Sequence, residues 1–155
     1  MKRQEDLGAP VNTIKLVLPS NSVNEGIARA VIAAFCAHLE PTATDIADVK
    51  CAVSEAVTNC IVHAYKQGAG KIYITAEAFA DATVKITVRD KGCGIADVKQ
   101  ARQPLFTTDA ESERSGLGFT VMESFMDKLS VRSKEGVGTT VTMWKRFGAD
   151  VGTRL

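Results

Sequence analysis

The first part of the chain combines one strand-like pattern with two helix-like patterns. Residues 13–18 form a short β-branched and aliphatic run that ends at Pro19, which is typical of a strand. Apolar positions then recur at helical spacing over residues 23–38. A second and longer helical pattern covers residues 44–65. We therefore expect the order strand, helix, helix in this part.

The rest of the chain is richer in strand patterns, in which apolar and polar positions alternate. Four segments show this alternation: residues 71–79, 82–90, 128–135 and 139–147. Residues 116–127 favour a helix, and a short helix is expected soon after residue 95. The polar residues 103–115 show no periodicity, which predicts a loop or a lid.

The order of these elements decides the fold class. Strands and helices do not alternate regularly, so a doubly wound parallel sheet is disfavoured. The pattern predicts an α+β protein, a two-layer α/β sandwich in which helices cover one face of a mixed, mostly antiparallel sheet. We expect one domain over residues 1–155, with a core at about 13–147 and a frayed tail at 148–155.

Composition narrows the class of protein. The 155 residues are 45% apolar and 24% charged, which is typical of a globular domain. Lys and Arg number 19 against 18 Asp and Glu, a net charge of +1 that disfavours direct binding to nucleic acid. The longest apolar run, residues 30–37, is far short of the roughly 20 residues that cross a bilayer.

The N-terminus and the cysteines bear on localisation. The first six residues include acidic side chains and no apolar stretch, which disfavours a signal peptide. The four cysteines form no C-x-x-C pair, and Cys36, Cys51 and Cys60 lie in apolar helical patterns where a small buried thiol is expected. We therefore expect a reduced, cytoplasmic protein that does not contact a membrane.

One carboxylate stands out in the second predicted helix. Glu55 is the only charged residue between Cys51 and Val62, and Asn59 and His63 follow it at i+4 and i+8 on the same helical face. A carboxylate can accept a hydroxyl proton, and an amide oxygen can bind a hard cation such as Mg²⁺. A solvated face of a surface helix explains the same spacing equally well. The predicted core stripe lies on another face and consists of Val49, Val53, Ala56, Val57 and Cys60.

A second cluster of polar and glycine residues ends the strand at 82–90. Asp90 has the same parity as the apolar Val84, Ile86 and Val88, so a straight strand points its carboxylate inward. Gly92 and Gly94 follow at once and allow backbone to approach a ligand closely. An ordinary turn of the Asp-x-Gly type is the alternative.

A third cluster lies where the helix at 116–127 is expected to begin. Gly116, Leu117 and Gly118 follow Arg114, so free backbone N–H groups and a fixed positive charge could bind a phosphate there. A simple N-cap by Ser115 explains the segment as well.

Taken in order, these motifs resemble the ATP-binding boxes of the Bergerat-type superfamily, which includes gyrase and histidine-kinase ATP domains. The boxes are Glu55-x-x-x-Asn59, Asp90-x-Gly92-x-Gly94, Gly116-x-Gly118 and residues 138–140. Residues 54–59, 87–90, 101–108 and 113–119 further resemble the anti-sigma F factors of spore-forming bacteria. The likeness extends over residues 14–145.

The resemblance implies a serine kinase that uses ATP with Mg²⁺ and has two protein partners, sigma factor F and an anti-anti-sigma protein. It implies that Glu55 is the general base, Asn59 the Mg²⁺ ligand and Asp90 the acceptor of the adenine amino group, with Thr139 near the base. Other positions that it implies are Gly92, Gly94, Gly116, Leu117 and Gly118 around the nucleotide, Arg114 near the γ-phosphate, and Arg29 at a partner. A homodimer is also implied, and ATP or ADP would bias which partner is held.

Three other functions remain open at this point, and the least favoured is the detached catalytic domain of a histidine kinase, since 155 residues leave little room for a separate His-bearing helical domain. The chain could be a kinase of the same type that serves a general-stress sigma factor. It could also be a binding module that uses ATP only to set its shape, in which case Glu55 has a structural role.

Overall fold

The alternating segments form five strands of one sheet. The computed structural model describes residues 2–66, 68–104 and 117–148. The strands follow the order β1-β2-β3-β5-β4 across the sheet, and all four pairings are antiparallel. They are β1 (Asn12–Pro19), β2 (Lys71–Ala78), β3 (Thr83–Asp90), β4 (Lys128–Lys134) and β5 (Gly138–Arg146).

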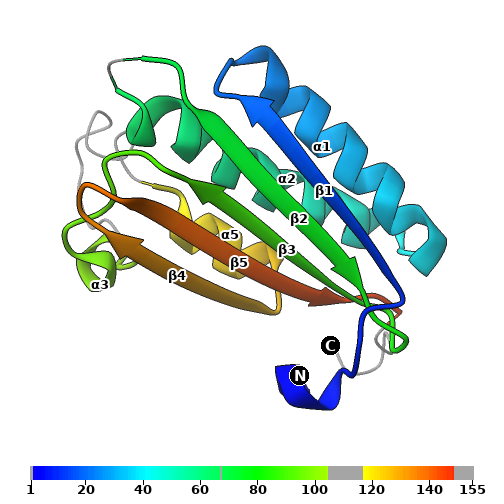
Figure 1. Ribbon diagram of the computed structural model, residues 1–155. Coiled ribbons are helices and arrows are strands. Elements are labelled where there is room, and N and C mark those ends of the chain that lie inside the picture. Colours follow the sequence, from blue (N-terminus) through cyan, green and yellow to red (C-terminus); the bar gives the residue numbers. More distant parts are fainter. Residues whose placement is uncertain (1, 67, 105–116, 149–155) are drawn as a thin grey trace.

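The helices lie against one face of this sheet, as Figure 1 shows. The longer ones are α1 (Val23–Cys36), α2 (Ala43–Asn59) and α5 (Phe119–Phe125). Shorter helical segments are η1 (Gln4–Asp6), η2 (Ala37–Leu39), η3 (Cys60–Ala64) and α3 (Val98–Ala101). The predicted two-layer α+β fold is confirmed, and the opposite face of the sheet carries no helical layer in the described residues.

The core lies between the two layers. Alternate residues of each strand turn toward the helices, and Ile74, Ile86 and Met143 are at most 1% exposed. All members of the predicted core stripe of α2 are buried, with Val53 and Val57 at 0% exposure. Helix α2 is therefore held by its apolar face, which fixes where its polar face points.

Helix α2 has well-defined ends. At its start Thr42 and Asp45 form a capping box, in which the Thr42 hydroxyl accepts a hydrogen bond from the backbone N–H of Asp45 at 3.0 Å. At its end the helix widens into the π-helical turn η3 and stops before Tyr65. Single π-turns of this kind are frequent at functional sites.

Two expectations from the sequence were wrong in detail. The helix expected at 116–127 is shorter within the described residues, because Gly118 caps α5 in the left-handed region and Met126 is already extended. Cys51 is exposed, not buried, because it lies four residues before Glu55 on the polar face of α2.

No helix in the described part of the chain is long and apolar enough to cross a membrane.

Candidate functional site

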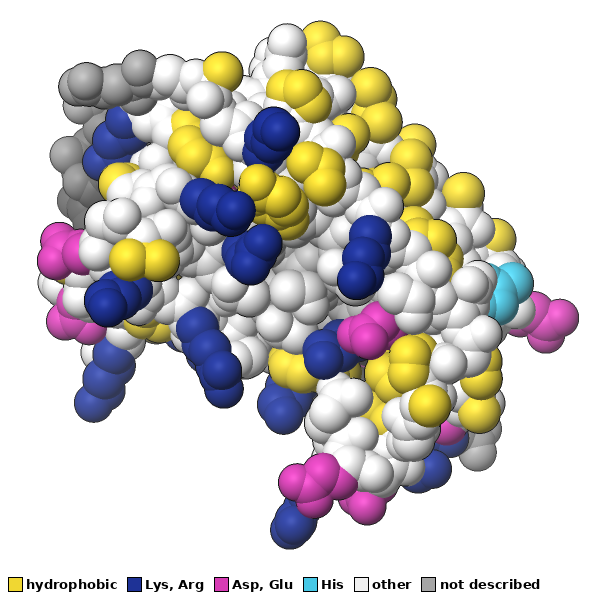
Figure 2. Space-filling view, in the orientation of Figure 1, with side chains coloured by type: hydrophobic (Ala, Val, Ile, Leu, Met, Phe, Trp, Pro, Cys, Tyr) yellow, Lys and Arg dark blue, Asp and Glu magenta, His cyan; other side chains and the backbone are white. Residues whose placement is uncertain are grey.

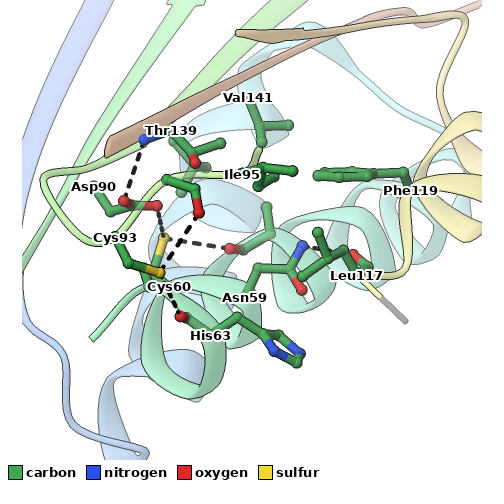
Figure 3. A pocket seen from close by; sticks show the side chains of 14 residues that line it. Asn59, Cys60, His63, Asp90, Cys93, Ile95, Leu117, Phe119, Thr139 and Val141 are labelled. Atoms are coloured by element: carbon green, nitrogen blue, oxygen red, sulfur yellow. Dashed lines mark hydrogen bonds between the residues drawn. The ribbon is translucent and has the colours of Figure 1, made fainter. Parts of the chain in front are cut away.

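The main pocket lies between the C-terminal end of α2 and the end of the sheet where β3 stops and β5 begins. Its cavity volume is about 30 Å³, which is room for about one or two water molecules. Figure 3 shows how side chains from the helical layer and from the sheet point into it. Its lining consists of Ala56, Asn59, Cys60, His63, Ala64, Val88, Asp90, Cys93, Gly94, Ile95, Leu117, Phe119, Thr139 and Val141.

Asp90 is the buried acid of this pocket. Its side chain is 6% exposed, as the parity of β3 predicted. Its Oδ1 atom accepts hydrogen bonds from the backbone N–H groups of Gly92 at 3.0 Å and Thr139 at 3.2 Å. The Oδ2 atom receives only the weak thiol donor of Cys60, at 3.7 Å, from the described residues. This oxygen is therefore able to accept a further hydrogen bond from a ligand.

The Cys60 thiol is fixed beside this carboxylate. Burial, together with the negative charge of Asp90, raises the pKa of the thiol above its ordinary value, so it stays protonated and acts as a donor. His63, one turn further, lines the pocket. Its pKa is lowered, mainly by burial and also by the nearby charge of Lys66. The sequence placed Cys60 in the core stripe but did not reveal its contact with Asp90.

A hydroxyl network holds the sheet side of the pocket. Thr139 is 8% exposed, and its hydroxyl lies 2.8 Å from that of Ser133. The Ser133 oxygen also accepts a hydrogen bond from the backbone N–H of Ile95 at 2.7 Å. Ser133 was missed in the sequence, although its register opposite Thr139 across a short hairpin could have revealed it.

Gly92 and Gly94 lie where two backbone segments come close. A Cβ atom on Gly92 would be 2.3 Å from the carbonyl oxygen of Ala64, and one on Gly94 would be 2.2 Å from that of Lys134. Gly94 also has a positive φ of 73°. The space that these glycines leave is filled by the chain's own backbone, whereas the sequence had suggested space for a ligand. They lock the loop after β3 between η3 and β4.

The polar face of α2 connects this pocket to a second one. The Asn59 side-chain N–H donates to the carbonyl oxygen of Leu117 at 2.5 Å, and its side-chain oxygen Oδ1 accepts from no described group. One turn earlier, Glu55 lies against Gly118, where a Cβ atom would be 2.3 Å from the carboxylate oxygen Oε2. Gly118 has a φ of 66°, so both its backbone and its surroundings favour glycine.

Glu55 lines a groove of about 480 Å³ between α1, α2 and α5. Arg29 and Lys50 give this groove positive charge, and Val121 and Phe125 give it an apolar side. Arg29 forms an ion pair with Glu25 at 3.3 Å. Glu25 in turn accepts a hydrogen bond from the Ser54 hydroxyl, which ties α1 to α2 beside Glu55.

The structure thus brings most of the predicted residues to one place. Asn59, Asp90, Gly94, Leu117 and Thr139 line the main pocket, and Gly92 adjoins it. The groove is lined by Glu55 and Arg29, and Gly118 lies against Glu55 at the boundary. Arg114 and Gly116 lie outside the described residues, as does most of the predicted lid.

The donor set can be tested for Mg²⁺. In the described part of the chain, no group of three His, Cys, Asp or Glu side chains could hold a metal on its own. Mg²⁺ commonly uses only one or two protein oxygens and takes its other ligands from substrate phosphates and water. The Asn59 oxygen fits that role, because it has no other described partner and its residue lines the pocket.

The sequence matches known proteins over most of its length. Residues 18–145 match the family described as histidine kinase-like ATPase domain. An anti-sigma F factor of Caldanaerobacter subterraneus subsp. tengcongensis is 55% identical over 138 residues, which cover 88% of this chain and 95% of that protein. The anti-sigma F factor of Bacillus subtilis is 47% identical over 137 residues, which cover 88% and 93%.

Solved structures show the same fold at low sequence identity. The RsbU and RsbW domains of Rv1364c from Mycobacterium tuberculosis align with a TM-score of 0.65 and 22% identity, covering 90% of this chain and 33% of that chain. The catalytic domain of the histidine kinase ThkA aligns with a TM-score of 0.54 and 16% identity, covering 88% and 97%.

Proposed function

Since the chain belongs to the anti-sigma F factor family within the histidine kinase-like ATPase domains, we propose that it binds and inhibits sigma factor F and phosphorylates a serine of the anti-anti-sigma protein with ATP. The curated relatives of both organisms named above are anti-sigma F factors, which favours sigma factor F over a general-stress sigma factor.

One observation carries the kinase proposal: two cavities adjoin neighbouring turns of the same helix face. Asn59 lines the enclosed pocket beside Asp90, and Glu55, four residues earlier, lines the open groove. A phosphoryl donor in the pocket and a protein hydroxyl in the groove would therefore meet at α2. A module that uses ATP only to set its shape would not need a carboxylate at this junction.

Asp90 gives the pocket its proposed preference for adenine. Its Oδ1 atom is held by two backbone N–H groups, so the orientation of the carboxylate is fixed before a ligand binds. Its Oδ2 atom can then accept a hydrogen bond from the adenine amino group. Guanine carries a carbonyl oxygen at the corresponding ring position, and two acceptors would face each other.

Glu55 is the proposed general base. It would accept the proton of the serine hydroxyl while the serine oxygen bonds to the γ-phosphorus and the bond to the leaving ADP oxygen breaks. Arg29 and Lys50 lie in the same groove and favour an approaching acidic or phosphorylated segment. The proposed Mg²⁺ would neutralise phosphate charge, and the Asn59 oxygen would hold it. The roles of Arg114 and Gly116 remain predictions.

The kinase proposal is tested by phosphate transfer from labelled ATP to the anti-anti-sigma protein. We expect Glu55→Ala to keep ATP binding and to lose about 10²- to 10⁴-fold in transfer rate, the usual span for a general base. The matched control is Glu135→Ala, which removes an exposed carboxylate from the hairpin between β4 and β5. Unchanged transfer by Glu55→Ala, or no transfer by the unaltered chain, would contradict the proposal.

Binding of sigma factor F is a separate proposal with its own test. Sedimentation of the chain with purified sigma factor F, in ATP and in ADP, measures both the complex and the proposed homodimer. We expect a complex whose stability depends on the nucleotide, and a weaker complex for Arg29→Ala. Equal binding in ATP and ADP would argue against nucleotide control of partner choice.

A further inference from the structure

The face of the sheet away from the helices is strongly basic. Figure 2 shows Lys and Arg side chains over much of the area above the strands and few acidic ones. The basic side chains that β2 to β4 and the turn after β3 place there are Lys71, Lys85, Arg89, Lys91, Lys128, Arg132 and Lys134. Among the outward-facing strand positions, Glu77 is the acidic one. The chain is nearly neutral as a whole, but its basic side chains are concentrated on this face.

The strand register arranges this face into three parallel rows that cross the sheet. The middle row, here called the hydroxyl row, consists of Lys15, Thr75, Thr87, Thr142 and Ser130. On one side lies the Tyr73 row, which consists of Val17, Tyr73, Arg89, Thr140 and Arg132. On the other side lies the Trp144 row, which consists of Thr13, Glu77, Lys85, Trp144 and Lys128.

The hydroxyl row and the space above it are here called the trough. Its β1 to β3 part is hollowed into a groove of about 320 Å³, which Lys15, Thr75 and Thr87 line together with Val17, Tyr73 and Arg89 of the Tyr73 row. With strands about 4.8 Å apart, the whole row is about 19 Å long, and the flanking rows are about 13 Å apart. The trough therefore has room for one extended chain.

Cations stand on both sides of the trough with little to neutralise them. Lys85 is paired with Glu77 at 3.7 Å. No ion pair joins Arg89, Lys128 or Arg132 to a carboxylate of the described residues. Cations of this kind on both sides of a polar floor are complementary to a chain whose acidic side chains project to both sides.

We propose that this trough binds an extended acidic segment of a protein partner, with its backbone on the hydroxyl row and its carboxylates against the two flanking rows. Side chains of an extended peptide point alternately to opposite sides, so successive Asp or Glu residues meet both rows of cations. About six residues at roughly 3.3 Å each span the 19 Å trough. The proposal does not depend on the kinase activity, because α2 and its two cavities lie on the other side of the sheet.

A nucleic acid strand fits the same face less well. Its phosphates and bases lie on different sides, and base stacking needs an open aromatic face. The Tyr73 ring already has Arg89 and Lys91 at 4.9 Å from its centre, and the Trp144 ring has Lys85 at 5.8 Å and Lys128 at 4.7 Å. Membrane insertion is also disfavoured, because the described strands expose a single large apolar side chain, that of Val17.

The test uses the whole chain and a synthetic peptide of eight glutamates. Trp144 is the only tryptophan of the chain. Its side chain is 9% exposed, packs with Leu7 and Phe79 and lies under Lys128, so its fluorescence reports on changes at the Trp144 row. We expect the peptide to change that fluorescence, to bind more weakly as salt rises, and to shift the amide resonances of Thr75, Thr87 and Thr142. A peptide of eight glutamines should do none of these.

Matched charge reversals locate the binding surface. We expect Lys128→Glu combined with Arg132→Glu to weaken the acidic peptide about tenfold or more, given the coupling that close charge pairs show. Lys66→Glu combined with Lys99→Glu changes the net charge equally at exposed positions off this face and should weaken it less than about threefold. If the variant with both Lys128→Glu and Arg132→Glu does not fold, the resonance shifts of the unaltered chain still show where the peptide binds.

Four results would overturn the proposal. The first is an equal loss of peptide affinity in the two double variants, and the second is a set of amide resonance shifts that fall on the helical side of the sheet. The third is tighter binding of an eight-nucleotide thymidine strand, or of anionic vesicles, than of the acidic peptide. The fourth is a homodimer whose sedimentation changes only when Lys128 and Arg132 are both replaced by glutamate. The last result would make a second copy of the chain the occupant.

Discussion

Replacing Gly118 by alanine should separate the stability of the fold from the position of Glu55. Gly118 has a φ of 66°, and a Cβ atom there would be 2.3 Å from the Glu55 carboxylate oxygen. An L residue in the left-handed region costs roughly 1–2 kcal/mol. The carboxylate is the end of a flexible side chain, so turning it away adds at most about 1 kcal/mol. We therefore expect the free energy of unfolding to fall by about 1–3 kcal/mol.

The rate of phosphate transfer should fall as well. The new methyl group would lie 2.3 Å from the Glu55 carboxylate oxygen, which is too close, so the proposed base must move. A misplacement of about 1 Å can cost on the order of 10²-fold in rate. We expect transfer to the anti-anti-sigma protein to fall by at least that factor, whereas ATP affinity should change little.

Gly136→Ala is the matched control. Gly136 has a similar φ of 76°, but a Cβ atom there would meet no atom within 4 Å. It should lose the same 1–2 kcal/mol from backbone strain and keep its transfer rate. Urea unfolding and labelled-ATP assays measure both quantities.

The double variant Gly118→Ala/Glu55→Ala completes the test. Both changes act on one carboxylate, so the double variant should be no slower than Glu55→Ala alone. The reasoning is refuted if Gly118→Ala transfers phosphate at the normal rate, or if the two losses multiply.

Three further predictions concern the pocket and the core. Asp90→Asn should keep the fold but weaken ATP about 10- to 100-fold in calorimetric titration, because an N–H group would then face the adenine amino group. Val53→Ala should lower the free energy of unfolding by about 2–3 kcal/mol, since Val53 is 0% exposed, whereas Val62→Ala, at 54% exposure, should cost less than about 0.5 kcal/mol. The pKa of His63 is lowered in the folded state, so the unfolded state binds more protons just below pH 6.5. The free energy of unfolding should therefore rise with pH through that window. His63→Gln should reduce this dependence on pH.

Each of these has a result that contradicts it. For Asp90→Asn it is an equal loss of affinity for ATP and GTP. For the core it is a similar cost at Val53 and Val62. For His63 it is an unchanged dependence of the urea midpoint on pH in the His63→Gln variant.

Alternation and periodicity predicted every strand and the buried face of α2. Strand parity also placed Asp90 inside, and its 6% exposure agrees, because the side a residue faces in a straight strand depends on position alone. Helical spacing was a better guide than residue type at Cys51, which is apolar but exposed because it continues the line of Glu55 and Asn59. Spacing within one helix or strand was a sufficient guide wherever the side that a residue faces depends on that element alone.

Contacts between elements were beyond these rules. The thiol of Cys60 meets Asp90 only because the end of α2 packs on the end of β3, and no spacing within either element indicates it. The close neighbours of Gly92 and Gly94 are likewise backbone atoms from η3 and β4. The motifs indicated that glycine was needed there, but the cause of that need lies in tertiary packing.

The basic face of the sheet is a feature that net charge does not reveal. A net charge of +1 is a sum over the whole surface and cannot distinguish a neutral surface from one with opposed faces. Parity within each strand assigns Lys85 and Arg89 to one side of β3, and Lys128 and Arg132 to one side of β4. Only the order β3-β5-β4, in which the last two strands exchange places relative to the sequence, aligns these pairs around Trp144 and Thr140. The sheet topology therefore turns scattered cations into two rows, and the binding properties of this face depend on that topology more than on composition.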